Sequence, residues 1–512
     1  MRRSLLNLIL IVGWVMVPTT PIWAQREMPR VGTGAPPKKT APAPVRKARP
    51  PAPVRKKASP AVPAISAETY VTRGHAALKE NLYDQAIAEY TAALNINPDL
   101  MVALIGLGNA HLKKGSYTSD VIAIFIFTEV LKRQPALTEV LLNRAALYLK
   151  RGNFEEALTD YSTLIESKPE EATYYFDRGL VWQKKGEPDP AISDYREAVR
   201  LKPAFIEAYQ NMGDCFIALV SKDGETTRSF HLEKAIEIYT QAIKLRPDSV
   251  SLYRSRGKAY REQGDHAQVI SDFTEVIRLD PNDAEAYKLR GEAYGERKSY
   301  SLAIGDLTMA ANLEPNDMEV YQLRVIQYEL VKDYSGVIVD CTEIIKRKPD
   351  DIEAYRRRAN AYLRTQYYTE SIADFNKIIQ LNPLDTSVYC EMGRVYFKAA
   401  EYDQSIDSFR KALVRNPNLR TDYLSTFADA YFFRGQLALI AKKYLQAIAD
   451  YDEAIKINPF YFQAFYERGE AYLARVQKEK AIADFKKVLM LAPRNDSFYK
   501  EAEKQLKKLK AK

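Results

Sequence analysis

"YKLRGEAYGE" (residues 287–296) places an arginine, a glycine and two tyrosines in a helical pattern. The four residues follow the i, i+3, i+4, i+7 spacing that brings side chains to one face of a helix. They are Tyr287, Arg290, Gly291 and Tyr294. A helix normally buries such a face, so the guanidinium needs either a bound ligand or a structural partner. The two alternatives place the function in different parts of the molecule.

The stretch belongs to a repeat. A proline follows a helix-like segment twelve times between residues 98 and 493, and most steps between these prolines are 34 residues long. A fixed period of this length predicts a solenoid of helix–turn–helix repeats. We number each repeat so that its proline stands at position 32. The predicted repeats, one to twelve, span 67–100, 101–137, 138–171, 172–205, 206–249, 250–283, 284–317, 318–351, 352–385, 386–419, 428–461 and 462–495.

Small and aromatic residues recur at fixed positions of this repeat. Position 8 is Gly or Ala in eleven repeats, with Val325 the exception, and position 24 is aromatic in ten. Cys341 replaces the usual ring at position 24, so we expect it to pack in the core. Small residues let two helices approach closely, and the rings fill the space between neighbouring repeats.

This pattern resembles the tetratricopeptide repeat family over residues 67–495. The resemblance implies an all-α fold, a right-handed superhelical solenoid of antiparallel helix pairs. It also implies that the first helices of successive repeats line a concave groove, and that the protein binds peptides or other proteins. Residues 496–512 are predicted to form a C-terminal capping helix with a lysine-rich outer face.

Position 7 is Arg in nine repeats, and the same nine repeats carry an acidic residue at position 23. The other three repeats lack both. A partly buried arginine without a partner is costly, so this joint presence predicts an ion pair inside each repeat. The reading of these arginines as ligand anchors is disfavoured. The predicted pairs are Arg73–Glu89, Arg144–Asp160, Arg178–Asp194, Arg256–Asp272, Arg290–Asp306, Arg324–Asp340, Arg358–Asp374, Arg434–Asp450 and Arg468–Asp484.

Residues that do not recur are the better candidates for binding a partner. The family resemblance implies that positions 2, 5, 6, 9, 12 and 13 face the groove. The predicted peptide-binding residues there are Arg356, Arg357, Asn360, Arg364, Arg394, Phe432, Phe433 and Tyr466. Arg356 and Asn360 resemble half of a carboxylate clamp found in the family, although Glu391 stands where that clamp has Asn. Basic and aromatic anchors together suit an acidic–apolar peptide. Solvated charges and core-packed rings remain the alternatives.

The N-terminal 66 residues differ from the repeats. Residues 1–24 combine two arginines, an apolar core and Ala24, which predicts a cleaved export signal; an uncleaved inner-membrane anchor is the alternative. Residues 25–66 form a Pro/Ala/Lys/Arg-rich linker, expected to be disordered. Residues 1–66 hold twelve Lys or Arg and one acid, whereas the rest of the chain holds 63 basic and 65 acidic residues. Residues 26–57 could therefore contact an anionic envelope surface, and no attraction for nucleic acid is expected.

The sequence shows no constellation for catalysis. Its four histidines and three cysteines are scattered, without metal-ligand spacing, and no phosphate-binding glycine loop or nucleophile motif occurs. We therefore expect no enzyme activity, no cofactor and no metal. The sequence favours an exported protein- or peptide-binding scaffold of the periplasm or cell envelope. A periplasmic chaperone for envelope complexes and an envelope tether acting through the basic linker remain alternatives. The partner is not identified, and self-association is left open.

Overall fold

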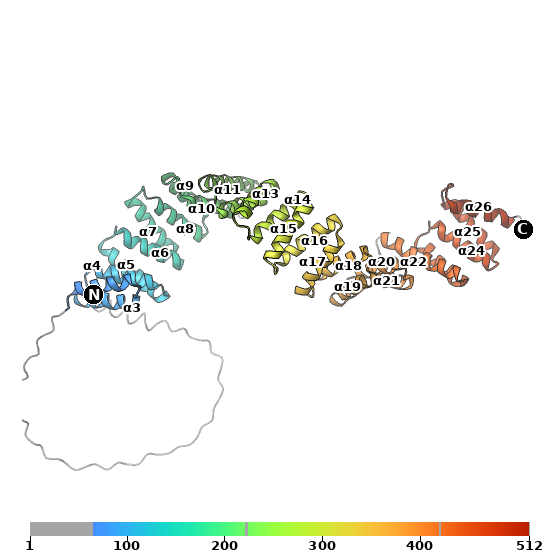
Figure 1. Cartoon of the computed structure of the whole chain (residues 1–512), viewed down its shortest axis with the longest axis horizontal. Helices are drawn as coiled ribbons and strands as arrows, with labels where there is room; N and C mark the ends of the chain where they lie inside the picture. The colour runs from blue at the N-terminus through green and yellow to red at the C-terminus, as the bar shows by residue number, and fades with distance from the viewer. Residues whose placement is uncertain (1–64, 221–223, 419–420, 511–512) are drawn as a thin grey trace, which may run out of the picture. The chain divides into compact units, whose positions relative to one another are not determined.

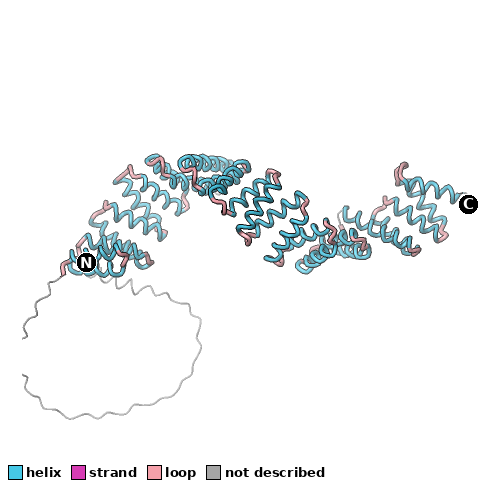
Figure 2. Tube along the Cα trace, viewed as in Figure 1, coloured by secondary structure: helices cyan, strands magenta, loops and turns pink. Residues whose placement is uncertain are grey.

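The computed structural model describes residues 65–220, 224–418 and 421–510. Within these ranges the chain forms 25 helices and no strand, as Figures 1 and 2 show. None of these helices combines the length and apolar composition needed to cross a membrane. The predicted all-α solenoid of antiparallel helix pairs is confirmed. The predicted signal and nearly all of the linker lie outside the described residues.

The helices group into two compact bodies. The N-terminal body ends at Arg246 and holds repeats one to five. Its helices are α2 (Ala67–Lys79), α3 (Tyr83–Ile96), α4 (Met101–Lys114), α5 (Tyr117–Arg133), α6 (Thr138–Arg151), α7 (Phe154–Ser167), α8 (Ala172–Lys185), α9 (Pro188–Leu201), α10 (Ile206–Val220) and α11 (Glu225–Leu245).

The C-terminal body begins at Pro247 and holds the remaining repeats. Its first helices are α12 (Val250–Gln263), α13 (His266–Leu279), α14 (Ala284–Glu296), α15 (Tyr300–Leu313), α16 (Met318–Val331), α17 (Tyr334–Arg347), α18 (Ile352–Arg364) and α19 (Tyr368–Leu381). They are followed by α20 (Ser387–Lys398), α21 (Tyr402–Arg415), α22 (Thr421–Ile440), α23 (Tyr444–Ile457), α24 (Phe462–Ala474), α25 (Lys478–Leu491) and the terminal α26 (Ser497–Lys510).

Aspartates at position 34 start several first helices. The side chain of Asp283 accepts a hydrogen bond from the Ala286 amide at 3.0 Å, and that of Asp351 does the same for Ala354. Asp317 caps α16 by accepting from the Glu319 amide. These side chains satisfy amides that have no partner within the helix. The helix after Asp385 starts one residue later, with Thr386 as its N-cap.

The core of most repeats is an aromatic ring at position 24 packed on a small residue at position 8. The position-24 rings are buried, and a methyl group built on the position-8 glycine would collide with them. On Gly469 it would lie 2.7 Å from Cε1 of Phe485, and on Gly435 it would lie 2.8 Å from Cε1 of Tyr451. Position 8 must stay small because the ring occupies that space.

Two extensions depart from the simple pair. Helix α22 begins at Thr421, before the predicted start of repeat eleven at residue 428. The added turns bury Phe427, whose ring centroid lies 5.3 Å from that of Phe409. At the C-terminal end of the body, α26 packs on α24 and α25 by burying Ala502 and Leu506.

The contact between ring and glycine predicts opposite effects for two Gly→Ala changes in the C-terminal body. Gly469→Ala should lower the free energy of unfolding by about 1–3 kcal/mol, because the new methyl overlaps Phe485. Gly305 lies within helix α15 with open space beside it. Gly305→Ala should therefore raise stability by about 0.5–1 kcal/mol through helix propensity. Denaturant unfolding checks both, and equal effects of the same sign would contradict the packing account.

Candidate functional site

The position-7 arginines form the ion pairs inside their own repeats. Arg290 donates from Nε to Asp306 Oδ2 at 2.7 Å and from Nη2 to Asp306 Oδ1 at 2.8 Å. The same two-point contact, with an Nη2–Oδ1 distance of 2.7 Å, joins Arg178 to Asp194, Arg256 to Asp272 and Arg358 to Asp374. A two-point contact of the same kind joins Arg144 to Asp160, Arg324 to Asp340, Arg434 to Asp450 and Arg468 to Asp484, with Nη2–Oδ1 distances of 2.5–2.7 Å.

Repeat one is the exception, and the prediction for it is wrong. Arg73 is exposed and makes no ion pair among the described residues. Glu89 keeps a buried Oε2 without a hydrogen-bond partner. Its side chain is one methylene longer than that of the aspartates in the other repeats. Repeat one also has no earlier repeat in the described part of the chain to support its guanidinium.

Sequence reasoning missed that most of the paired arginines also bind the preceding repeat. Arg290 Nη1 donates to Thr274 Oγ1 at 3.1 Å, and Arg358 Nη1 donates to Thr342 Oγ1 at 3.0 Å. Both hydroxyls lie 16 residues before the arginine, on the second helix of the earlier repeat. The recurrence of Ser or Thr 16 residues before these arginines is the sequence signal that could have predicted this contact. The guanidinium therefore joins three helices, and charge-assisted bonds of this kind are the stronger ones.

The flanking tyrosines of the opening stretch complete this environment. The guanidinium carbon of Arg290 lies 5.7 Å from the ring centroid of Tyr287 and 5.9 Å from that of Tyr294. These distances suit cation–π attraction. The hydrogen bonds that Arg290 donates to Asp306 raise the pKa of Arg290, so the side chain stays charged. Arg290 is thus engaged on all sides by its own protein.

Two predicted groove arginines are also occupied by acidic residues. Arg356 Nη2 lies 2.5 Å from Asp385 Oδ2, and its Nη1 binds Glu391. This second contact removes the predicted half of a carboxylate clamp, because Glu391 takes the place of a ligand carboxylate. Asn360 turns away as well, since its Nδ2 donates to the carbonyl oxygen of Arg356 at 3.0 Å.

Arg357 is bound in the same way. Its Nη1 lies 2.5 Å from Glu329 Oε2, and its Nε lies 2.9 Å from Glu353 Oε1. Burial raises the pKa of Glu329, and the charge of Arg357 opposes that rise. Arg356 and Arg357 are therefore not free to bind the carboxylates of an acidic peptide. The expectation of an acidic–apolar partner loses its main support.

The remaining predicted residues divide by exposure. Arg364 is exposed and makes no ion pair in the described part of the chain, while the Arg394 guanidinium lies 6.0 Å from the ring centroid of Tyr423. Phe433 is 38% exposed and stacks on Tyr402. Phe432 is only 6% exposed, so its assignment to the groove is corrected to the core.

Tyr466 also packs inward. Its ring centroid lies 5.5 Å from that of Phe485 and 5.3 Å from that of Phe498 on the capping helix. Burial raises the pKa of its hydroxyl to about 12. The assignment of Tyr466 to the groove is therefore corrected to the junction between repeat twelve and its cap.

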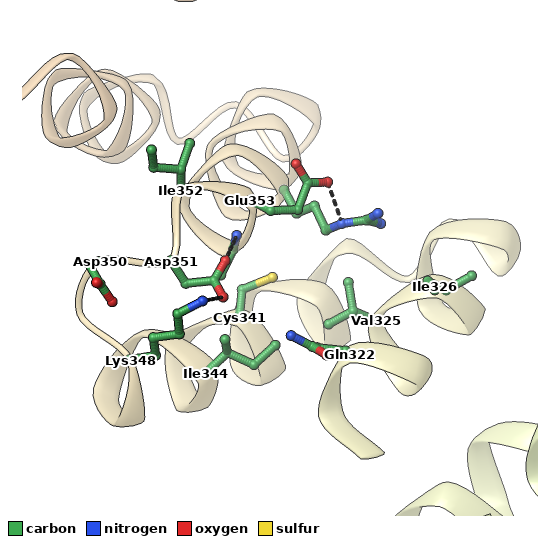
Figure 3. A pocket seen from close by; sticks show the side chains of 12 residues that line it. Gln322, Val325, Ile326, Cys341, Ile344, Lys348, Asp350, Asp351, Ile352 and Glu353 are labelled. Atoms are coloured by element: carbon green, nitrogen blue, oxygen red, sulfur yellow. Dashed lines mark hydrogen bonds and ion pairs between the residues drawn. The ribbon is translucent and has the colours of Figure 1, made fainter. Parts of the chain in front are cut away.

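An open hollow of about 460 Å³ lies between α16, α17 and α18 (Figure 3). Its apolar lining comes from Val325, Ile326, Cys341, Ile344, Ile352 and Ala354. Its polar lining comes from Gln322, Lys348, Asp350, Asp351, Glu353 and Arg357. Gln322, Ile326 and Arg357 occupy repeat positions that face the groove in the family pattern, so the hollow belongs to that face.

Two substitutions explain why the hollow exists in repeat eight. Cys341 stands at position 24, where most repeats have a ring, and Val325 at position 8 fills only part of the lost volume.

Position 5 of repeat eight also differs from position 5 of its neighbours. Lys288 binds the next helix N-cap, Asp317, at 2.9 Å, and Arg356 binds Asp385. In repeat eight the position-5 residue is Gln322, which carries no charge. The corresponding aspartate, Asp351, pairs with Lys348 at 3.2 Å instead.

Exposed apolar residues continue from the hollow along α16. Ile326 is 40% exposed and Leu330 is 52% exposed, and they lie one turn apart on the same face. Exposed apolar area beside a concave, partly polar hollow is typical of a binding surface. These residues were absent from the sequence-based selection, because isolated aliphatic side chains on a helix give no recognisable signal.

Comparisons with known proteins agree with this architecture. Tetratricopeptide repeat models match residues 67–100, 142–204, 231–264, 257–298, 352–385, 390–462 and 435–498. The chain belongs to the tetratricopeptide repeat family. In this family the repeated helix pairs form a scaffold for protein–protein interaction.

The individual relatives share only parts of the array. Human tetratricopeptide repeat protein 13 is 33% identical over 95 residues, which are 18% of this chain and 11% of that protein. Human Superkiller complex protein 3 is 30% identical over 101 residues, covering 20% of this chain and 6% of the other. The matches thus span a small fraction of either relative.

Parts of the chain are also similar to tetratricopeptide repeat proteins of known structure, at low identity. A tetratricopeptide repeat protein from Parabacteroides merdae is 21% identical, covers 51% of this chain and 98% of its own, and has a TM-score of 0.35. YrrB, described as having an unusual peptide-binding site, is 20% identical, covers 38% of this chain and 96% of its own, and has a TM-score of 0.33.

The ion pairs of this tetratricopeptide array predict a non-additive mutational effect. Asp306→Ala should destabilise by about 3 kcal/mol, because it leaves Arg290 partly buried without its carboxylate. Arg290→Leu with Asp306→Ile copies Leu107 and Ile126 of repeat two, both of which are buried. The double variant should recover much of the lost stability. A double variant no more stable than Asp306→Ala, measured by denaturant unfolding, would refute the pairing account.

The buried thiols predict slow alkylation. Burial raises the pKa of both Cys341 and Cys215 to about 12 and that of Cys390 to about 11. Because the thiolate is the reactive form, a thiol reagent at pH 7–8 should label the native protein far more slowly than the denatured protein. Labelling followed by mass spectrometry measures this difference. Rapid stoichiometric labelling of native Cys341 would contradict the assigned burial.

Proposed function

We propose that this protein is a non-catalytic scaffold of the cell envelope that binds a protein or peptide partner on the groove face of its C-terminal body. The observation that carries the proposal is the hollow between α16, α17 and α18, with Ile326 and Leu330 exposed beside it. Many other groove positions in this body are engaged by cross-repeat ion pairs. The apolar surface of α16 is therefore the part of the groove best suited to gain from losing water.

Export to the envelope is part of this proposal. It is supported by the charged start, apolar core and Ala24 of residues 1–24. We expect the mature protein to begin at Gln25 and to fractionate with the periplasm. N-terminal sequencing after fractionation tests this, and a chain that retains Met1 in the inner membrane would favour the uncleaved anchor.

The basic linker favours a secondary role as an envelope tether. Residues 26–57 carry most of the excess positive charge of the chain. Contacts with an anionic surface weaken as salt screens them. Envelope association should therefore fall with rising salt, and it should fall further when residues 26–57 are deleted. Association unaffected by both changes would refute this tethering role.

Affinity capture with matched variants tests partner binding. Ile326→Ser with Leu330→Ser removes the exposed apolar residues of α16 and should abolish capture of a stoichiometric partner. Leu302→Ser with Met309→Ser removes similarly exposed residues from α15, the second helix of repeat seven, and should leave capture intact. Equal capture by both variants would contradict the assigned surface. Many substoichiometric clients in place of one partner would support the chaperone alternative.

A further inference from the structure

The hollow between α16, α17 and α18 has an apolar floor and an acidic rim. Val325, Cys341 and Ile344 form the floor, and each is at most 3% exposed. Glu353 stands at the rim, and its Oε1 lies 2.9 Å from Arg357 Nε. Asp350 lies apart on the preceding loop (Figure 3). Asp350 is exposed and has no ion-pair partner within the described part of the chain.

The charges around this hollow do not balance. Lys348 is paired with Asp351, and Arg357 lies between Glu329 and Glu353. The lining therefore holds two basic side chains, Lys348 and Arg357, and three carboxylates, and Glu329 beside Arg357 adds a fourth carboxylate next to the lining. The surplus is negative, and a complementary ligand would bring positive charge to the rim.

A second hollow in the same body is also lined by more acidic than basic side chains. About 310 Å³ of space lies between α12, α13 and α14, beside Glu262, Glu292 and Glu296. Arg261 lines it too, but its Nη2 lies 3.0 Å from Glu292 Oε2. His266 is the other titratable group of this lining. The acidic character thus recurs two repeats before the first hollow.

We infer that the hollow between α16, α17 and α18 binds an aliphatic side chain of a partner peptide that carries Lys or Arg next to it. This inference rests on the proposed function and reverses the charge preference expected from the sequence. Ile326 and Ile352, the aliphatic lining residues that are not buried, pack against the aliphatic group above the buried floor, and the neighbouring cation faces Asp350 and Glu353. A volume of about 460 Å³ lies within the range of small-ligand sites, roughly 300–1,000 Å³. It has room for one large apolar side chain and its adjoining backbone.

A labelled peptide, Ser-Gly-Arg-Ile-Lys-Gly-Ser, tests the inference by fluorescence anisotropy with the full chain. Two control peptides replace Arg and Lys by Glu and Asp, or Ile by Ser. The basic–apolar peptide should bind at least tenfold more tightly than either control, and its affinity should fall as salt rises. Tighter binding of the acidic peptide, or equal binding of all three, would overturn the inference.

Two kinds of variant close the hollow by copying other repeats. Val325→Gly with Cys341→Phe restores the pairing of Gly257 and Phe273, and should weaken peptide binding at least tenfold. Gln322→Arg restores the position-5 cation, which should reach Asp351 as Arg356 reaches Asp385, and should weaken binding comparably. Gln322 is exposed, so this second variant tests the inference even if the core change prevents folding. Unchanged peptide affinity in folded Gln322→Arg protein would overturn the inference.

The chain's own linker contains similar chemistry, because "APVRKA" (43–48) and "APVRKK" (52–57) place a valine before Arg and Lys. A variant lacking residues 26–57 separates the two sources. Equal peptide affinity of the full chain and this variant supports an external partner. At least tenfold tighter binding by the variant would mean that the linker occupies the hollow, and would overturn the assignment to a partner.

The inference and the proposed function fail in different ways. If Gln322→Arg protein still captures the partner captured by the full chain, the assignment of the hollow is wrong but the scaffold function stands. If the full chain captures no partner, the scaffold function itself fails. Loss of both peptide and partner binding in Gln322→Arg, with an unchanged melting temperature, is the expected result.

Discussion

The packing of a ring at position 24 against a small residue at position 8 sets the distance between the two helices of a repeat. Phe485 on Gly469 and Tyr451 on Gly435 are examples in which even one added methyl has no room. This contact explains the regular appearance of the array. It also explains the hollow, because Cys341 leaves space that Val325 only partly fills. The departure at Cys341 and Val325 thus coincides with the feature best suited to bind a partner.

Electrostatics adds a second layer of order. The position-7 guanidinium joins both helices of its repeat to the second helix of the repeat before it, through carboxylate and hydroxyl acceptors. Such partly buried pairs contribute modest net stability. Removing only one partner is costly, because the other charge stays buried without a partner. Groove-facing charges follow the same logic, since Lys288, Arg356 and Arg357 bind Glu319, Glu391 and Glu329 of neighbouring repeats. Much of the groove charge is therefore used to align helices.

The sequence predicted the repeated features and failed at the singular ones. The pairing of Arg290 with Asp306 could be predicted because the two residue types appear and disappear together across the repeats. Phe432 and Phe433 could not be separated, because adjacent residues differ by about 100° around a helix and the extended start of α22 shifts the packing. The occupation of Arg356 by Glu391 depends on distances between repeats that no local pattern contains. The sequence shows that Cys341 and Val325 depart from the repeat pattern. The volume of the hollow beside them can be known only once the positions of α16, α17 and α18 are known.

Photo-cross-linking of the basic–apolar peptide, with a benzophenone side chain in place of its Ile, tests the central claim most directly. Mass spectrometry of the cross-linked full chain locates the residue that the apolar side chain reaches. The structure predicts adducts on α16, α17 or α18 around Val325, Ile326 and Ile344, and their loss in Gln322→Arg protein. Adducts mainly on helices other than α16, α17 and α18, or spread evenly over both bodies, would contradict the assignment of the hollow as the binding site.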